Sequence, residues 1–178
     1  QSGRVASVAS LGSLCEQSRL RRLPGLDGTV RWDMLSTIHD FALERFQTLP
    51  EASELRLAHA HAYLAIAEES EWFEVTNQPE LAATFEADLD NYRFALRSLQ
   101  EQTAVESQNM LRLATMLADY WWIRGHTTEG RLWLENAVAG AGGEQSLDLG
   151  RALACLLYTS DAADDPLCVA LGGCRHIK

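Results

Sequence analysis

The side chains best suited to binding a metal ion lie in residues 155–178. Cys168, Cys174 and His176 carry thiol and imidazole groups, which are the usual ligands of zinc. A structural zinc site needs closely spaced cysteine pairs and a complete tetrahedral set of ligands. The spacing in this segment offers neither, so the sequence predicts no metal site here.

Other reactive side chains are also poorly placed for catalysis or cofactor binding. His59 and His61 lie two positions apart, on different sides of a helix, so they cannot share a metal ion. The glycines in residues 140–143 could suggest a phosphate-binding loop, but that loop needs a Lys, and the only Lys is Lys178. Cys15 lies on an apolar stripe, as a small core residue does. We predict no catalytic residue, cofactor or metal in this chain, which is therefore not an enzyme by itself.

The composition indicates a folded chain that makes no direct contact with nucleic acid. Of its 178 residues 47% are hydrophobic, and the formal net charge is −10. Such an acidic chain lacks the basic face that nucleic acids and anionic membranes require. No apolar run reaches the roughly 20 residues of a membrane-spanning helix. We see no signal peptide and expect a cytoplasmic protein, and because the chain begins at Gln1 we expect its own beginning to be missing.

Residues 1–47 are expected to fold as a helix, a β-hairpin and a second helix. Turn-forming residues separate two short extended segments in "LRRLPGLDGTVRWDML". Val30, Trp32 and Met34 alternate with charged residues, which predicts a strand with these three side chains buried. Ser36 is a suitable N-cap for the helix that follows.

Residues 48–154 show the spacing of successive helices, with breaks near Pro79 and Gly125. A Thr, either Thr127 or Thr128, can cap the fourth helix. Successive antiparallel helices with short connections predict an all-α superhelix. The apolar residues expected to face its core are Leu55, Ala58, Ala62, Ile66 and Phe73 in the first helix, Leu81, Phe85, Leu89, Tyr92 and Leu96 in the second, Leu113, Ala114, Leu117, Ala118 and Trp121 in the third, and Leu132, Leu134 and Ala137 in the fourth.

The segment "MLADYWWIRGHTTEGRLWLENAV" fits the 34-residue tetratricopeptide pattern. That pattern needs small residues where two helices touch and large residues that fill the space between them. Long helical hairpins in unrelated bundles could show the same pattern. The small residues are Ala118, Gly130 and Ala137, the large ones are Trp121 and Leu134, and Gly125 forms the turn.

Three segments together resemble the bacterial signal-transduction ATPases with numerous domains, which include regulators of the NB-ARC, LuxR and SARP types. The run "LGSLCEQSRLRRLPGLDGTVRWDMLSTIHDFALERF" is similar to the end of the family's winged-helix domain, "FEADLDNYRFALRSL" to a helix that follows it, and "YWWIRGHTTEGRLWLENAV" to its first clear repeat. The run departs from the family pattern at Trp32, His39 and Asp40. The matching residues are Arg31, Met34, Leu35, Thr37, Ile38, Ala42, Glu44 and Arg45 in the first segment, and Glu86, Asp90, Asn91, Arg93, Ala95 and Leu96 in the second.

The resemblance implies a mainly α fragment of a multidomain ATP-dependent transcriptional regulator. Residues 1–47 would be the C-terminal part of a winged helix with a β-hairpin, and residues 48–154 a truncated tetratricopeptide-like superhelix. ATP and Mg would be bound by a missing upstream nucleotide-binding domain, which this fragment would contact. The repeats would bind an inducer or a protein or peptide ligand. The alternatives are a free-standing tetratricopeptide adaptor and the regulatory tail of a kinase or cyclase.

One stripe of the third long helix is the candidate partner-binding surface. Arg112, Thr115, Asp119 and Trp122 follow one another at helical spacing, and in tetratricopeptide arrays this stripe faces the ligand groove. Large exposed aromatic residues often anchor interfaces. For both Trp122 and its neighbour Trp121, burial between helices is the alternative.

Residues 155–178 differ from the rest of the chain. They contain three of the four Cys and the only Lys. When back-translated, "CLLYTSDAADD" and "CVALGGCRHIK" resemble the two parts of a transposon-end adapter used in sequencing libraries. We therefore expect this segment to be an adapter-derived tail, against the alternatives of a disordered tail or a metal-binding knuckle.

Overall fold

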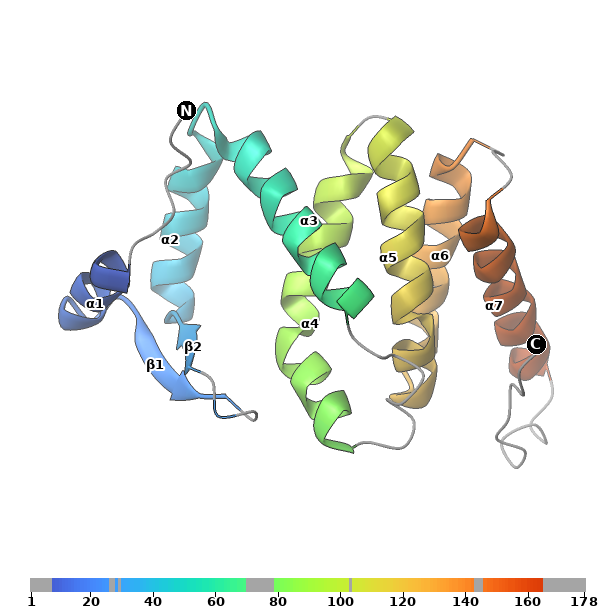
Figure 1. The fold of residues 1–178 in the computed structure, drawn as a ribbon, viewed down its shortest axis with the longest axis horizontal. Helices are drawn as coiled ribbons and strands as arrows, with labels where there is room; N and C mark the ends of the chain where they lie inside the picture. The colour runs from blue at the N-terminus through green and yellow to red at the C-terminus, as the bar shows by residue number, and fades with distance from the viewer. Residues whose placement is uncertain are drawn as a thin grey trace.

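The computed structural model describes residues 8–25, 28, 30–69, 79–102, 104–142 and 146–164. This part of the chain is mainly helical and contains one two-stranded antiparallel sheet, which confirms the mainly α prediction. Figure 1 shows α3 to α7 standing next to one another as a helical array, with an N-terminal unit of α1, β1, β2 and α2 at one end. The elements in chain order are α1 (Val8–Glu16), β1 (Arg21–Pro24), β2 (Val30–Asp33), α2 (Ser36–Gln47), α3 (Ala52–Glu69), α4 (Pro79–Gln100), α5 (Ala104–Ile123), α6 (Thr127–Gly140) and α7 (Leu147–Asp164).

The core of the helical array is built mainly by α4 and α5. Phe85, Leu89, Tyr92 and Leu96 of α4 are buried, as their helical spacing predicted, while the side chain of Leu81 lies outside the described part. Burying one such side chain stabilises the fold by about 1.5–3 kcal/mol. The predicted residues of α5 are buried too, apart from a half-buried Ala118: Leu113, Ala114, Leu117 and Trp121.

The predicted core face of α3 was wrong. Leu55 and Ile66 are 45% and 47% exposed, and Ala58 and Ala62 are exposed as well. Apolar residues occur on every side of α3, so their spacing does not distinguish the inward face. Small side chains face α4 and α5 instead, because they let the helices approach closely. Phe73 lies outside the described residues. The buried residues of α3 are Ala52, Ala60, Leu64 and Ala67.

The predicted buried face of β2 was also wrong. The strands pair with Arg22 opposite Trp32, and the Arg22 guanidinium lies 5.6 Å from the centre of the Trp32 ring. Val30 and Trp32 are 46% and 37% exposed, Met34 is half-buried, and Arg31 on the opposite face is half-buried. Alternate residues of a strand point to opposite faces. The face that carries Arg31 is the one turned toward the helical array.

The helix caps differ from their predictions. Leu35 occupies the N-cap of α2, and Ser36 is already the first helical residue. His126 occupies the N-cap of α6, which begins at Thr127. Neither N-cap makes a side-chain hydrogen bond to the helix. The predicted capping roles of Ser36 and of Thr127 or Thr128 are therefore wrong, because these residues lie inside the helices and the N-cap is the residue before each helix.

The contact between α5 and α6 depends on small residues, as predicted. Gly125 ends α5 with φ of +78°, a left-handed conformation that favours glycine. Gly130 lies against Trp121, since a Cβ atom added at Gly130 would be 2.8 Å from the Trp121 Cβ. Leu134 and Ala137 are buried on the same side of α6. The large indole therefore fills the space that Gly130 leaves open.

Helix α7 continues past Ala154 to Asp164. Cys155 and Leu156 are half-buried against the core. Alanine and leucine favour helix whatever their origin, so this helix does not test whether residues 155–178 are an adapter-derived tail. That statement about the tail stays a prediction.

Candidate functional site

The predicted partner-binding residues lie along one side of α5. Arg112, Asp119 and Trp122 are exposed, and Thr115 is half-buried. The two neighbouring indoles are in different environments: Trp121 is 1% exposed and Trp122 is 37% exposed. We call Arg112, Thr115, Asp119 and Trp122 the α5 surface. The burial of one Trp and exposure of the next follows from the turn of about 100° per residue in an α-helix.

Arg112 connects three helices across the α5 surface. Its Nη1 donates a hydrogen bond of 2.9 Å to Oε1 of Glu68 in α3, and its Nε lies 3.5 Å from Oδ2 of Asp148 in α7. The Thr115 hydroxyl donates to the Leu111 carbonyl oxygen at 2.7 Å, within α5. The positive charge of Arg112 is therefore balanced by two carboxylates from neighbouring helices.

Asp119 supplies a further carboxylate on the α5 surface. Among the described residues it has no hydrogen-bonded or ionic partner. Nearby protein atoms partly desolvate its carboxyl group and raise its pKa above the ordinary value, although the residue remains exposed. Trp122 follows it by three positions, on the same side of the helix. An exposed carboxylate beside an exposed indole can bind a cationic side chain, through an ion pair and a cation–π contact.

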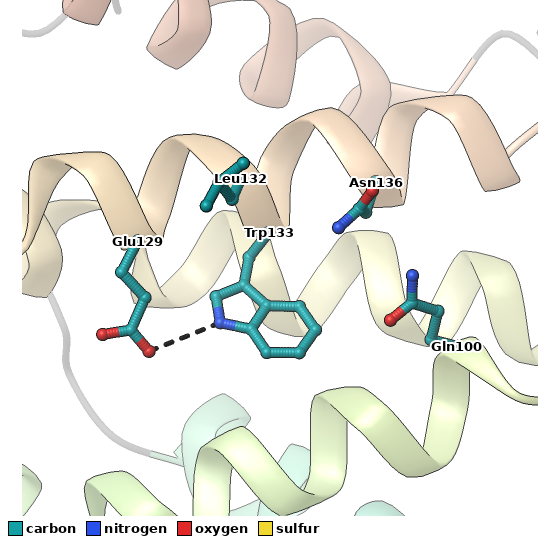
Figure 2. Close-up of a pocket in the computed structure, with 5 residues that line it drawn as sticks. All are labelled: Gln100, Glu129, Leu132, Trp133 and Asn136. Carbon is teal, nitrogen blue, oxygen red and sulfur yellow. Dashed lines mark hydrogen bonds between the residues drawn. The ribbon is translucent and has the colours of Figure 1, made fainter.

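A shallow groove of about 330 Å³ lies on α4 and α6 (Figure 2). The Trp133 indole N–H donates to Glu129 Oε1 at 3.4 Å. Hydrogen bonds from Arg93, at 2.6 Å to each Glu129 oxygen, are the main reason that the pKa of Glu129 is lowered. Leu132 is 56% exposed, which corrects its predicted place in the core. The groove, which the sequence did not reveal, is lined by Gln100, Glu129, Leu132, Trp133 and Asn136.

A polar cluster around Asp88 joins the N-terminal unit to the helical array. Arg31 of β2 donates two hydrogen bonds to the Asp88 carboxylate of α4, from Nη1 to Oδ2 at 2.9 Å and from Nη2 to Oδ1 at 2.5 Å. Asn91 Nδ2 and the Tyr63 hydroxyl donate to Oδ1 at 3.0 Å and 3.4 Å. We call these four residues the Asp88 cluster. The sequence singled out Arg31 and Asn91 but missed Asp88, which lies three residues before Asn91.

The carboxyl group of Asp88 should make the stability of the protein depend on pH. Burial by itself would raise its pKa, but hydrogen bonds from Arg31 and Asn91 and the Arg31 charge lower the pKa below the ordinary value. A depressed carboxyl pKa contributes stability above the unfolded-state pKa of about 3.9, and this contribution is lost as pH falls through the folded-state pKa. We expect Asp88→Asn to lower the free energy of unfolding by about 1–2 kcal/mol at neutral pH.

The difference between wild type and Asp88→Asn should shrink as the pH is lowered below about 4. Urea denaturation followed by circular dichroism at a series of pH values measures it. Asp40→Asn is a matched control, since this exposed aspartate contacts only its neighbour His39 among the described residues. A constant difference between wild type and Asp88→Asn at every pH would contradict the assignment to the Asp88 ionisation.

A second polar cluster lies on the other side of α4. Glu86 Oε2 accepts hydrogen bonds from the Tyr120 hydroxyl at 2.7 Å and from Arg124 Nε at 3.2 Å. His126 Nε2 lies 4.0 Å from Glu86 Oε1. The hydrogen bond from Tyr120 is the largest cause of the lowered pKa of Glu86. We call these residues the Glu86 cluster, and it ties α4 to the end of α5 and the start of α6.

The histidines have separate structural partners. The His59 ring packs against Tyr63 and Phe94, while His61 Nε2 lies 2.8 Å from Glu106 Oε2. The two rings therefore contact different residues. Within the described ranges, no group of three or more potential metal ligands occurs. Cys168, Cys174 and His176 lie outside these ranges.

No helix in the described part of the chain is both long and apolar enough to cross a bilayer.

Comparison with protein-family models, with curated proteins and with solved structures found no match in any of the three. A proposal about function must therefore come from the α5 surface, the Asp88 cluster and the Glu86 cluster.

Proposed function

We propose that this chain is the sensor and intramolecular switch region of a multidomain ATP-dependent transcriptional regulator. In this proposal the N-terminal unit is the end of a winged-helix domain, and the helical array is the start of a tetratricopeptide-like superhelix. The α5 surface binds an inducer or a protein or peptide ligand. Ligand binding then shifts the equilibrium between inactive and active states of the whole regulator.

The observation that carries the proposal is the open α5 surface. Its Asp119 carboxylate and Trp122 indole are exposed, while Arg112 is held in place by Glu68 and Asp148. This arrangement fits a peptide or inducer with a cationic group. Shifting a switch from 1:99 to 99:1 takes about 5.5 kcal/mol of differential binding, which an extended surface can supply.

ATP would be bound outside this chain. A nucleotide-binding loop needs a Lys followed by Ser or Thr after its glycines. The glycines in residues 140–143 are not followed by a Lys until Lys178. The residues of this chain therefore do not fit a nucleotide site, and no step of a nucleotide reaction is assigned to them.

The gene itself provides the first test of this proposal. We would sequence the source locus upstream of the codon for Gln1 and across codon 154, using a library prepared without the transposon adapter. A G-x-x-x-x-G-K-[ST] motif upstream, with further helical repeats after Ala154, would support a regulatory ATPase. An open reading frame with no such motif would support the alternative that the protein is a free-standing tetratricopeptide adaptor. A kinase or cyclase domain would make the array a regulatory tail. Codons 155–178 that persist at the locus would make the tail part of the natural protein.

Binding at the α5 surface should depend on Trp122 and Asp119. We expect peptides selected from a displayed random library to bind Trp122→Ala and Asp119→Asn about tenfold more weakly than wild type, as for residues that anchor an interface. Fluorescence anisotropy with the labelled peptide measures the Kd. Leu132→Ala, an exposed residue on α6, is the matched control and should bind like wild type. Equal affinity for all three variants would rule out the α5 surface as the binding site.

A further inference from the structure

The N-terminal unit is attached to the helical array by little apolar contact. No residue of α2 is buried, and Leu35, Phe41 and Leu49 are 45%, 58% and 46% exposed. Figure 1 shows α2 and α3 diverging from the short connection at residues 48–51, with the hairpin at the far end of α2. The N-terminal unit and the helical array are thus two bodies joined by a short connection. Two such bodies can rotate about the connection unless a second contact holds them together.

The Arg31–Asp88 pair is such a second contact. The Arg31 guanidinium makes two hydrogen bonds to the carboxylate and a third, of 3.0 Å, to the Ala87 carbonyl oxygen. The side chains are 30% and 20% exposed, so the pair is largely shielded from water but can be reached by it. Paired hydrogen bonds between Arg and a carboxylate fix both distance and orientation.

Helix α4 also connects this contact to the α5–α6 turn. Glu86 precedes Asp88 by two positions, which places the two carboxylates on roughly opposite sides of the helix. Glu86 accepts hydrogen bonds from Tyr120 and Arg124, which lie near the end of α5 that carries Trp122. A displacement of the end of α5 therefore acts on the same turn of α4 that holds Arg31.

We propose that the Arg31–Asp88 ion pair is a latch that holds the N-terminal unit against α4, and that movement of the α5–α6 turn, transmitted through Glu86, opens it. The connection at residues 48–51 is the hinge. This inference rests on the proposed function for its biological consequence, because a ligand on the α5 surface would be what moves α5. The latch itself is a property of the chain without ligand.

Spin labels on the two bodies can measure the latch directly. The exposed residues Asp40 of α2 and Glu135 of α6 are replaced by Cys for labelling, in a chain whose four Cys are changed to Ser. Double electron–electron resonance then gives the distance distribution between the labels. We expect one narrow distribution for the wild-type latch and a broad one, shifted to longer distance, for Arg31→Ala.

Charge exchange separates the latch from simple damage to the fold. Arg31→Asp and Asp88→Arg should each broaden the distribution, and the double variant should narrow it again. Arg21→Ala is the matched control, since Arg21 pairs with Asp33 inside the hairpin. Gly130→Ala, which forces α5 and α6 apart, should broaden the distribution. Glu86→Gln keeps the ion pair but weakens the link to the α5–α6 turn, so by itself it should leave the distribution narrow, and it should reduce the broadening caused by Gly130→Ala. Circular dichroism verifies that every variant keeps its helices.

The outcomes that would overturn the latch are specific. An unchanged distribution in Arg31→Ala, or equal broadening in Arg21→Ala, would mean that the ion pair does not hold the two bodies. Equal broadening by Gly130→Ala with and without Glu86→Gln would exclude the coupling through Glu86. Absence of any peptide binding at the α5 surface would remove the proposed function but leave these distances unaffected, so the two failures are distinguishable.

Discussion

Replacing Trp121 with alanine is expected to lower the free energy of unfolding by about 3–5 kcal/mol, the usual cost of removing a large buried aromatic side chain. The same change at the adjacent Trp122 should cost about 1 kcal/mol or less. Trp121 is 1% exposed and packs against Gly130, while Trp122 is 37% exposed on the α5 surface. The two positions thus form a matched pair of the same residue type in the same helix.

Urea denaturation followed by circular dichroism measures both changes. Trp121→Phe is a useful third variant, because the Trp121 indole N–H is buried and has no hydrogen-bond partner among the described residues. Phenylalanine keeps most of the packing and removes this unpaired donor, so it should cost less than alanine. Equal destabilisation by Trp121→Ala and Trp122→Ala would show that the two indoles are not separated between core and surface.

Gly130→Ala is expected to lower the free energy of unfolding by about 1–3 kcal/mol, the range found for overpacked cores. An added Cβ would lie 2.8 Å from the Trp121 Cβ and 2.9 Å from its Cε3, closer than such atoms can approach. Alanine favours helix over glycine by about 1 kcal/mol, which offsets part of this cost. Helices α5 and α6 must therefore separate, or the Trp121 ring must move.

Gly150→Ala is the matched control for this prediction. Gly150 lies inside α7, and its added Cβ would have no atom within 4 Å apart from its chain neighbours and the helix backbone, so alanine should stabilise the protein by up to about 1 kcal/mol. The urea denaturation midpoint should be lower than that of wild type for Gly130→Ala and higher for Gly150→Ala. Stabilisation by Gly130→Ala would mean that α5 and α6 are further apart.

The double variant Gly130→Ala with Trp121→Leu tests whether the two residues act on each other. A leucine leaves room for the added methyl group, so the cost of Gly130→Ala should fall when Trp121 is already replaced. Residues in contact commonly show coupling energies of about 0.5–3 kcal/mol. Additive effects would place the strain of Gly130→Ala elsewhere in the helix.

Much of the local structure could be predicted from the sequence because it depends on neighbours along the chain. The helical spacing in α4 and α5 identified their core residues, and Gly125 marked the end of α5, where φ is positive. The same logic failed in α3, whose apolar residues surround the helix. There the packing against α4 and α5 selected the alanines, and Leu55 and Ile66 stayed exposed.

The candidate site was also predictable only in part. Helical spacing placed Arg112, Thr115, Asp119 and Trp122 along one side of α5. The spacing did not reveal that Glu68 and Asp148, from two other helices, balance the charge of Arg112. The resemblance to a regulator family, with its winged helix and tetratricopeptide repeats, stays a prediction for these residues.

The amino-acid sequence by itself determined which segments are helical, where the hairpin lies and which side of α5 carries the polar stripe. These features follow from spacing within a few residues, where backbone geometry repeats. Only the tertiary structure decided that Arg31 meets Asp88, that Glu86 meets Tyr120, and that Arg31 rather than Trp32 faces the array. These pairs are separated by 57 and 34 residues. No local pattern specifies such contacts, because they form only when packing of the core has brought distant helices together.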